Sequence, residues 1–158
     1  MNYHFDLASV SENLPGNMDL RLMANIQPVD SSQQFTGAVF TYATTPRGNV
    51  SATISYNLGD WRFSLMDRWV SSYRLSNRDG YIADPERIGA QNYIDFSMQK
   101  RFSMDGGNYT AYLSVQNLLN THTPLHPGGS GSPGLSYPLA QRGDLVGRYF
   151  TIGLRGNL

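Results

Sequence analysis

The sequence contains no cysteine and no excess of charge of either sign. The absence of cysteine excludes disulfide frameworks, zinc–thiolate sites and cysteine nucleophiles. Twelve basic residues balance twelve acidic ones, so no net charge attracts a polyanion, and we expect no nucleic-acid partner. Long apolar runs are also absent, since none approaches the roughly 20 residues of a membrane-spanning helix.

What the sequence does contain is alternation. Seven segments alternate apolar and polar side chains: residues 1–7, 17–27, 49–58, 61–74, 92–102, 109–116 and 147–158. A period of two gives a strand one apolar and one polar face, whereas helical spacing appears nowhere at comparable length. The sequence therefore predicts a single all-β, antiparallel domain.

The connections between these segments alternate between short and long. The short turns are rich in Gly, Asn, Asp and Pro and occupy residues 11–16, 58–60 and 103–108, whereas the long links cover 28–46, 75–89 and 118–147. In an up-and-down sheet, this order places all short turns at one end and all long links at the other, as in outer-membrane barrels. Most alternating segments also reach the roughly 9–11 residues that a tilted strand needs to cross a bilayer.

Aromatic residues gather at both ends of the predicted strands. Tyr56, Trp61, Phe102 and Tyr109 flank short turns, and Trp69, Tyr73 and Tyr93 lie toward the long links. Two aromatic girdles are typical of membrane barrels. The pattern therefore predicts an all-β, antiparallel up-and-down transmembrane β-barrel portion of about seven strands, with short periplasmic turns and long extracellular loops.

Two other architectures fit part of the pattern. A soluble sandwich or lipocalin-like barrel with its apolar parity turned inward explains the alternation equally well, but explains the strand lengths and the loop asymmetry less well. Alternatively, residues 34–42 (QFTGAVFTY) add an eighth strand and complete the smallest closed outer-membrane barrel. Because Phe35, Val39 and Phe40 break the alternation, we expect this segment to be the extramembrane part of a long loop or hairpin.

Three stretches resemble the last strands of TonB-dependent outer-membrane receptors. YTAYLSVQNLLNTHTP (109–124) resembles the penultimate strand, NYIDFSMQKRF (92–102) the strand before it, and GRYFTIGLRGNL (147–158) the last strand. The penultimate-strand motif is carried by Asn117, Leu118, Leu119, Asn120 and Pro124. The family usually ends in Phe, whereas this sequence ends in Leu158, and Gly156 interrupts the apolar parity of the last segment.

The resemblance implies a receptor of the cell outer membrane that imports a ferric siderophore or a similar scarce ligand. Such barrels have about 22 strands around a plug, and seven strands would leave two edges unpaired in lipid. We therefore expect residues 1–158 to be the C-terminal segment of a receptor barrel, without the plug domain or the TonB box. The implied partners are outer-membrane lipid, the remainder of the barrel and its plug, the barrel-insertion machinery through the last strand, and the TonB complex only through the missing N-terminal part.

The polar parity supplies the residues of the expected lumen wall. They are His4, Asp6, Arg21, Arg62, Arg68, Asp95, Arg101 and Arg155. We expect these side chains to form a wet wall with cross-strand ion pairs and hydrogen bonds.

The resemblance also implies that extracellular loops bind the ligand, so Tyr81, Arg87, His122 and His126 are the candidate ligand-binding residues. His122 and His126 have no third metal ligand tied to them in the sequence. The Gly-rich stretch that follows lacks the Gly-Lys-[Ser/Thr] ending of a phosphate-binding loop, and no motif joins a nucleophile to a base. We therefore expect no metal, no cofactor and no enzymatic activity.

Overall fold

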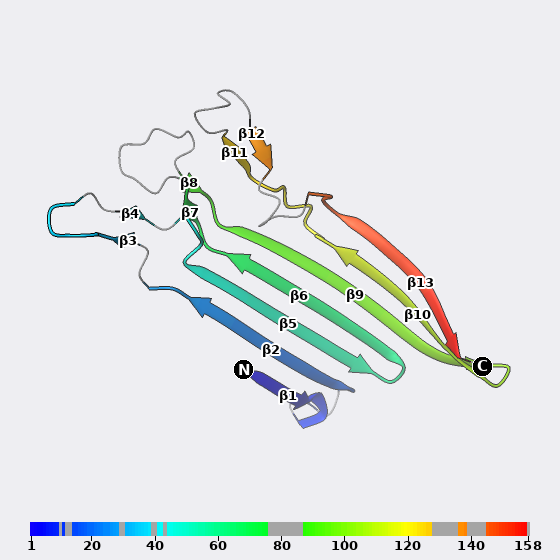
Figure 1. The fold of residues 1–158 in the computed structure, drawn as a ribbon. Coiled ribbons are helices and arrows are strands. Elements are labelled where there is room, and N and C mark those ends of the chain that lie inside the picture. Colours follow the sequence, from blue (N-terminus) through cyan, green and yellow to red (C-terminus); the bar gives the residue numbers. More distant parts are fainter. Residues whose placement is uncertain are drawn as a thin grey trace.

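The computed structural model of the chain describes residues 1–9, 11, 14–28, 31–38, 41–42, 44–75, 87–127, 136–138 and 145–157, without the side chains of 42, 125–127, 136–138 and 157. Seven strands form one antiparallel sheet in the order β1-β2-β5-β6-β9-β10-β13 (Figure 1). Their bounds are β1 Asn2–Asp6, β2 Asn17–Ile26, β5 Gly48–Leu58, β6 Trp61–Val70, β9 Gln91–Met104, β10 Gly107–Gln116 and β13 Tyr149–Asn157. Within the described residues no pairing joins β1 to β13, so the sheet is open and does not close into a barrel.

The predicted all-β, antiparallel, up-and-down order is confirmed. Several strand ends differ from the prediction by one or two residues, and β1 and β6 end earlier for a structural reason. Leu7 begins a short 3-10 turn, η1 (Leu7–Ser9), instead of ending β1. Tyr73 and Arg74 do not continue β6, because its ladder with β5 finishes at Ser71. The Ser71 amide donates to the carbonyl oxygen of Gly48, at 2.8 Å, and its hydroxyl accepts from the Gly48 amide, at 2.9 Å. Since β5 starts at Gly48, it offers no backbone for Tyr73 or Arg74 to pair with.

Each long link contains a two-stranded hairpin outside the main sheet. The hairpins are β3 (Ser31–Ser32) with β4 (Thr41–Tyr42), β7 (Tyr73–Arg74) with β8 (Arg87–Ile88), and β11 (Leu125–Pro127) with β12 (Ser136–Pro138). All three lie at one end of the sheet, here called the loop end, and the short connections lie at the other, the short-turn end (Figure 1). The described part of 34–42 lies in β4 and in the connection before it, so it adds no eighth strand to the sheet.

The register sorts side chains into an apolar and a polar face across the whole sheet. One row on the apolar face consists of Tyr3, Leu20, Ile54, Leu65, Phe96, Val115 and Phe150. The neighbouring row on the polar face consists of His4, Asp19, Ser55, Ser64, Ser97, Ser114 and Thr151. On every strand the members of the two rows are consecutive residues, which a pleated sheet directs to opposite faces.

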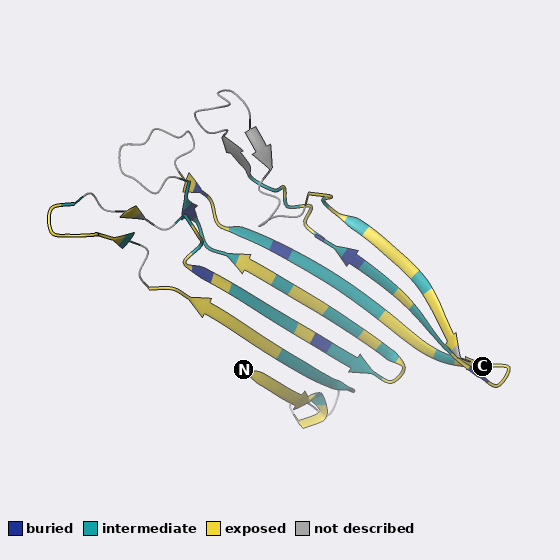
Figure 2. Ribbon diagram, in the orientation of Figure 1, coloured by how far each residue is buried: buried dark blue, intermediate teal, exposed yellow. Residues whose placement is uncertain are grey.

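Much of the apolar face is exposed. Ile152 is 80% exposed, Phe150 64% and Leu65 38%. Buried apolar residues are few in the described part, namely Tyr73, Ile88, Tyr93 and Val115. Figure 2 accordingly shows strands that are mostly exposed or intermediate along their length. The main sheet is therefore a single layer with one apolar surface, and the described residues supply no second layer to bury that surface.

Aromatic rings cluster on the apolar face at the short-turn end. Trp61 stacks on Phe63 with ring centroids 5.9 Å apart, and Phe102 stacks on Tyr109 at 5.7 Å. The Lys100 ammonium lies 4.8 Å from the Trp61 ring centroid, so its charge is placed over an aromatic face. The expected aromatic cluster at this end is present.

The loop end departs from the expected girdle. Trp69 lies on the apolar face and is 38% exposed. Tyr73 and Tyr93, by contrast, are both buried. Tyr93 lies opposite Arg68 on the polar face, because its parity within β9 differs from that of Ile94 and Phe96. Of the three aromatic residues expected at this end, Trp69 alone is exposed on the apolar face.

Asp67 is the single carboxylate on the apolar face of the described sheet. It lies between Ala52 and Ile94 in the register. Its Oδ1 atom is buried and has no hydrogen-bond partner among the described residues. A buried carboxylate oxygen without a donor is costly, so Asp67 opposes the otherwise apolar character of this face.

Gly156, which interrupts the apolar parity of β13, lies under an aromatic ring. A Cβ atom at Gly156 would lie 2.7 Å from Cδ1 and Cε1 of Tyr109, its register partner on β10. Because Tyr109 also stacks on Phe102, its ring has little freedom to move away. The ring thus fills the space that the missing side chain leaves.

We expect Gly156→Ala to destabilise the fold by about 1–3 kcal/mol, because the new methyl group overlaps the Tyr109 ring. Gly89→Ala is the matched control, since a Cβ there meets nothing within 4 Å. Gly89 lies between β8 and β9, and replacing a glycine by alanine at such an unhindered site is neutral or stabilising. The two substitutions should therefore change the free energy of unfolding in opposite directions, or only Gly156→Ala should change it. Urea unfolding in detergent measures both variants, and equal stabilities for the two would contradict the packing of Tyr109 on Gly156.

Candidate functional site

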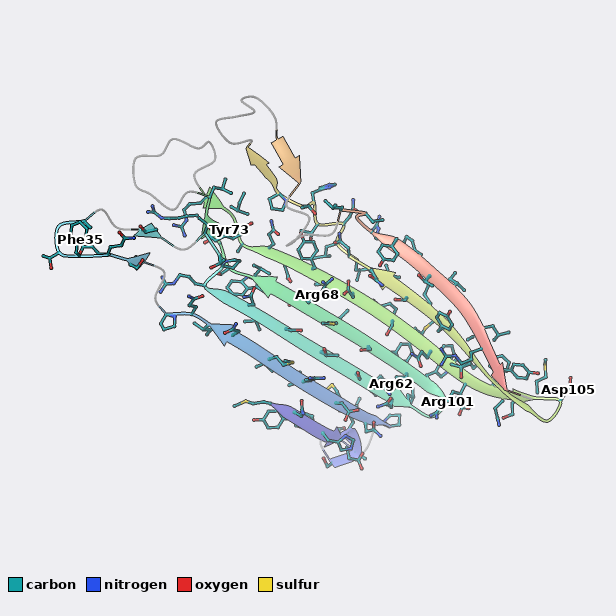
Figure 3. All side chains as sticks on the ribbon, in the orientation of Figure 1. Phe35, Arg62, Arg68, Tyr73, Arg101 and Asp105 are labelled. Atoms are coloured by element: carbon teal, nitrogen blue, oxygen red, sulfur yellow. The ribbon has the colours of Figure 1, made fainter. Side chains whose placement is uncertain are left out.

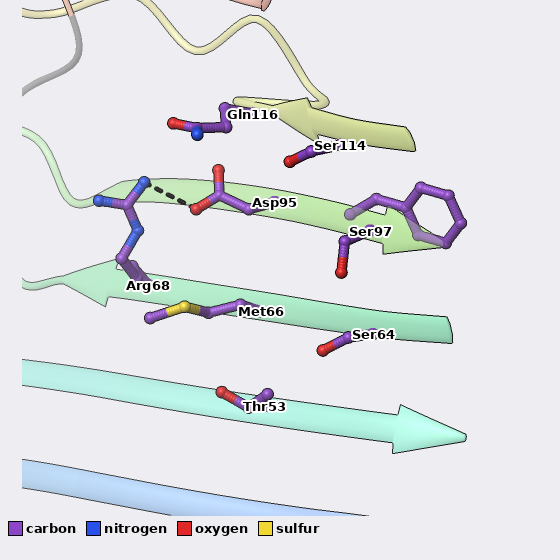
Figure 4. Close-up of a pocket in the computed structure, with 9 residues that line it drawn as sticks. Thr53, Ser64, Met66, Arg68, Asp95, Ser97, Ser114 and Gln116 are labelled. Atoms are coloured by element: carbon purple, nitrogen blue, oxygen red, sulfur yellow. Dashed lines mark hydrogen bonds and ion pairs between the residues drawn. The ribbon is translucent and has the colours of Figure 1, made fainter. Parts of the chain in front are cut away.

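A pocket of about 430 Å³ opens on the polar face (Figure 4). Its lining residues are Thr53, Ser64, Met66, Arg68, Asp95, Phe96, Ser97, Ser114 and Gln116. They come from β5, β6, β9 and β10, which are adjacent strands of the sheet. Because the register sets Ser64 opposite Ser97 and Met66 opposite Asp95, residues far apart in the sequence meet here.

The charged centre of the pocket is the Arg68–Asp95 pair. Arg68 Nη2 donates to Asp95 Oδ2 at 3.0 Å, and the two side chains are 45% and 23% exposed. The Arg68 guanidinium also lies 5.8 Å from the ring centroid of Tyr93, which stands beside it across the strand pair. The buried Tyr93 hydroxyl donates to Gln91 Oε1 at 3.2 Å. Arg68 is therefore held from two sides by residues of β9.

Asp95 also forms a hydrogen bond to the chain just after the end of β10. Its Oδ1 atom accepts the backbone N–H of Asn117 at 2.9 Å. Asn117 is fully buried, has φ of 51°, and exchanges hydrogen bonds with the backbone of Thr121 through both ends of its amide. The Thr121 hydroxyl donates to the carbonyl oxygen of Asn92 at 2.7 Å. The start of the third long link is thus tied to β9, and each oxygen of Asp95 has one partner.

Hydroxyl side chains form the remainder of the polar lining. Ser64, Ser97 and Ser114 belong to one cross-strand row, and Ser64 accepts a hydrogen bond from the Ser55 hydroxyl at 3.2 Å. Hydroxyl groups both donate and accept, so the pocket suits a polar ligand held by hydrogen bonds. The lining includes no histidine or cysteine, and no hydrogen bond joins one of its serines to Asp95, the one carboxylate of the lining.

The predicted wall of cross-strand pairs is present in part. Arg68 pairs with Asp95, and His4 Nδ1 lies 2.6 Å from Asp19 Oδ1 across β1 and β2. Asp6 instead accepts the backbone N–H of Ala8 at 3.2 Å. The other predicted wall residues, Arg21, Arg62, Arg101 and Arg155, form no ion pair with any side chain that the structure describes.

The four candidate ligand-binding residues lie on two long links. Arg87 is exposed in β8, opposite Arg74, and His122 is exposed between β10 and β11. The backbone of His126 lies in β11 opposite Tyr137, but its side chain is outside the description. Tyr81 lies outside the described residues. Both links belong to the loop end, and neither Arg87 nor His122 lines the Arg68–Asp95 pocket.

Sequence reasoning identified Arg68 and Asp95 as wall residues but did not identify their pairing or the pocket. Both depend on the register between β6 and β9, which alternation alone does not specify. Asn117 was part of a motif in the sequence, and its buried, positive-φ turn became visible only in the structure.

Comparisons of the chain with protein-family models, with curated proteins and with solved structures find no match. Among the described residues, no helix has the length and apolar character to cross a membrane. In the same part of the chain, no three His, Cys, Asp or Glu side chains come together as a metal site. The function must therefore be inferred from the fold and from the two faces of the sheet.

We expect Asp95→Ala to destabilise the protein by about 1–3 kcal/mol, because the Asn117 amide loses its acceptor and Arg68 loses its ion pair. Asp95→Asn keeps an acceptor oxygen for Asn117 and should cost less. Asp60→Asn, an exposed turn carboxylate, serves as the control. Denaturant unfolding of the three variants checks the order, and equal effects of Asp95→Ala and Asp60→Asn would contradict a fastening role for Asp95.

Proposed function

We propose that this chain forms part of the barrel wall of a TonB-dependent receptor in the cell outer membrane. The receptor imports a ferric siderophore or a similarly scarce ligand. This chain supplies wall and extracellular loops, and it has no enzymatic role. The plug and the contact with the TonB complex belong to parts of the receptor outside these 158 residues.

The observation that carries the proposal is the two-faced single sheet. Large apolar side chains are exposed on this face over β1, β2, β5, β6 and β13, with Phe150, Ile152 and Leu154 each more than half exposed on β13. Soluble proteins rarely leave so continuous an apolar surface in water. A bilayer covers such a surface without needing a second layer of protein, and outer-membrane barrels present an apolar band of this kind.

Strand length and connection length support the same proposal. β2, β6 and β10 each have 10 residues, β5 has 11 and β13 has 9. A tilted strand that crosses a bilayer needs about 9–11 residues. The two-residue turns at Gly59–Asp60 and Asp105–Gly106 fit periplasmic turns, and the three hairpin-bearing links fit extracellular loops.

The polar face supports a water-filled lumen. It carries the Arg68–Asp95 pair, the hydroxyl row and the His4–Asp19 contact. In this orientation the Arg68–Asp95 pocket lies toward the extracellular side, below the links that bear Arg87 and His122. Ligand contact in the loops, including Tyr81 and His126, is part of the proposal.

The membrane assignment predicts different surroundings for the two faces of the sheet in lipid. Because the chain has no cysteine, a single introduced cysteine allows one chosen position to be labelled with a fluorophore. We expect fluorophores at Leu65→Cys and Ile152→Cys to be quenched by brominated lipid. Those at the adjacent Ser64→Cys and Thr151→Cys should be quenched by aqueous iodide, because a pleated strand sends neighbours to opposite faces.

Each pair of neighbours is its own control for depth and for folding. Lipid quenching at both members of a pair, or at neither, would contradict the membrane assignment. Aqueous quenching at all four positions in a monomer that stays soluble without detergent would favour a soluble barrel instead.

The receptor assignment also predicts how transport depends on the length of the polypeptide. We expect the native outer-membrane polypeptide that contains GRYFTIGLRGNL to have a mass several times 17.6 kDa. Cells that produce this full polypeptide should take up a radiolabelled ferric siderophore, and cells that produce residues 1–158 alone should not. Uptake by residues 1–158 alone, or a native mass near 17.6 kDa, would refute the receptor assignment.

A further inference from the structure

Three arginines gather at the short-turn end of the polar face. Arg62 lies on β6, Arg101 on β9 and Arg155 on β13, and all three are exposed. Figure 3 shows Arg62 and Arg101 close to the connections that close this end of the sheet. None of the three has an ion pair or hydrogen bond from its side chain to a residue that the structure describes. This group is called the arginine cluster below.

The register brings the arginine cluster together. Arg101 and Arg155 both lie opposite Thr110, one on each side of β10. Arg62 lies opposite Gln99, which precedes Arg101 by two residues on the same face. Strands are about 4.8 Å apart, so Arg101 and Arg155 stand roughly 10 Å apart. Arg62 and Arg101 are diagonal neighbours at about 7–8 Å.

The nearest carboxylates do not neutralise this charge. Asp60 and Asp105 are exposed in the short turns and form no ion pair with the arginines. Asp19, two strands from Arg62, is within electrostatic reach of it, but its carboxylate is engaged by His4 and Asn57. Like charges held close on one face repel one another. The cluster is therefore a local excess of positive charge on a chain whose net charge is zero.

We propose that the arginine cluster is a docking surface for an acidic polypeptide segment from outside these 158 residues. An extended strand places alternate side chains about 6.6–6.8 Å apart on one side. Acidic residues at alternate positions are thus spaced more closely than the backbone positions of Arg62, Arg101 and Arg155, and the long arginine side chains can span the difference. Each guanidinium presents a planar fork that binds a carboxylate with two hydrogen bonds.

The setting of the cluster favours a polypeptide over a small anion. Small-ligand sites are concave and enclose most of their ligand. The Arg68–Asp95 pocket lies further toward the loop end, and none of the three arginines lines it. An open surface whose charges span three strand spacings and two residues along the strand, about 16 Å, suits a partner that is itself extended. The proposal depends on the polar face alone and stands whether or not that face lines a membrane barrel.

The test measures binding of a fluorescein-labelled heptapeptide of alternating Gly and Glu to the full 158-residue chain in detergent. A Gly–Gln peptide of the same length is the uncharged control. We expect the Glu peptide to bind, and binding to weaken steeply between low and physiological salt. Replacing all three arginines by glutamine should weaken binding at least about tenfold.

Two further variants keep the outcome interpretable. Arg21→Gln removes one exposed, unpaired arginine from the same face outside the cluster, and it should leave binding unchanged. Changing the three arginines to lysine keeps the charge and should retain most of the binding, which separates loss of charge from loss of fold. Equal binding of the Glu and Gln peptides, an effect of Arg21→Gln as large as that of the triple glutamine variant, or equally tight binding of citrate would each overturn the proposal.

Discussion

The structure depends on an unbroken backbone ladder that keeps seven strands in one register. Period-two alternation gives each strand two different faces, but only correct pairing joins them into two continuous surfaces. A slip of one residue between β6 and β9 would move Arg68 and Asp95 apart and turn a charged strand face toward the apolar side. The two-residue Gly59–Asp60 turn fixes the register of β5 with β6, and the Asp105–Gly106 turn, with both φ angles positive, fixes that of β9 with β10. A long link joins β6 to β9, so no tight turn sets the register between these two strands.

The open ladder also leaves two features of the sheet unsatisfied, namely its apolar face and its two outer edges. A sheet with one apolar face normally buries it against a second layer, yet here Ile152 and Phe150 stay exposed. Within the described residues β1 pairs with β2 alone and β13 with β10 alone, so each outer strand has a free edge. Both features are satisfied together if further strands continue the sheet and lipid covers its outer face. Water would satisfy the strand edges but not the apolar face.

The sequence was sufficient to predict the seven strands of the main sheet and the order of short and long connections, but not the short hairpin strands of the long links. Alternation is a local signal, and it located β2, β5, β9 and β10 to within a few residues. It failed where the outcome depended on a partner strand. Tyr73 and Arg74 keep the parity of β6, but β5 has ended by then, so they form a separate hairpin with β8.

The candidate site was predictable to a similar extent. Parity predicted that Arg68 and Asp95 share a face. Their pairing, the burial of Tyr93 and the turn at Asn117 depend on three strands meeting. Alternation within a single sequence does not specify which residues of neighbouring strands lie opposite one another. Gly156 illustrates the same limit, because the gap it leaves in β13 is filled by Tyr109 from the neighbouring strand.

The polar face is divided along the strands into two electrostatic regions. Toward the loop end, charge is paired: Asp95 satisfies Arg68 and the Asn117 amide, and serine hydroxyls complete the surface. Toward the short-turn end, Arg62, Arg101 and Arg155 have no described partner. Charges that are already paired gain little from a further partner. Unpaired charges of the same sign on one face repel one another, so they gain the most from binding a partner of opposite charge. The two ends are therefore suited to different tasks: the loop end to a polar ligand held by hydrogen bonds, and the short-turn end to a charged segment held by ion pairs.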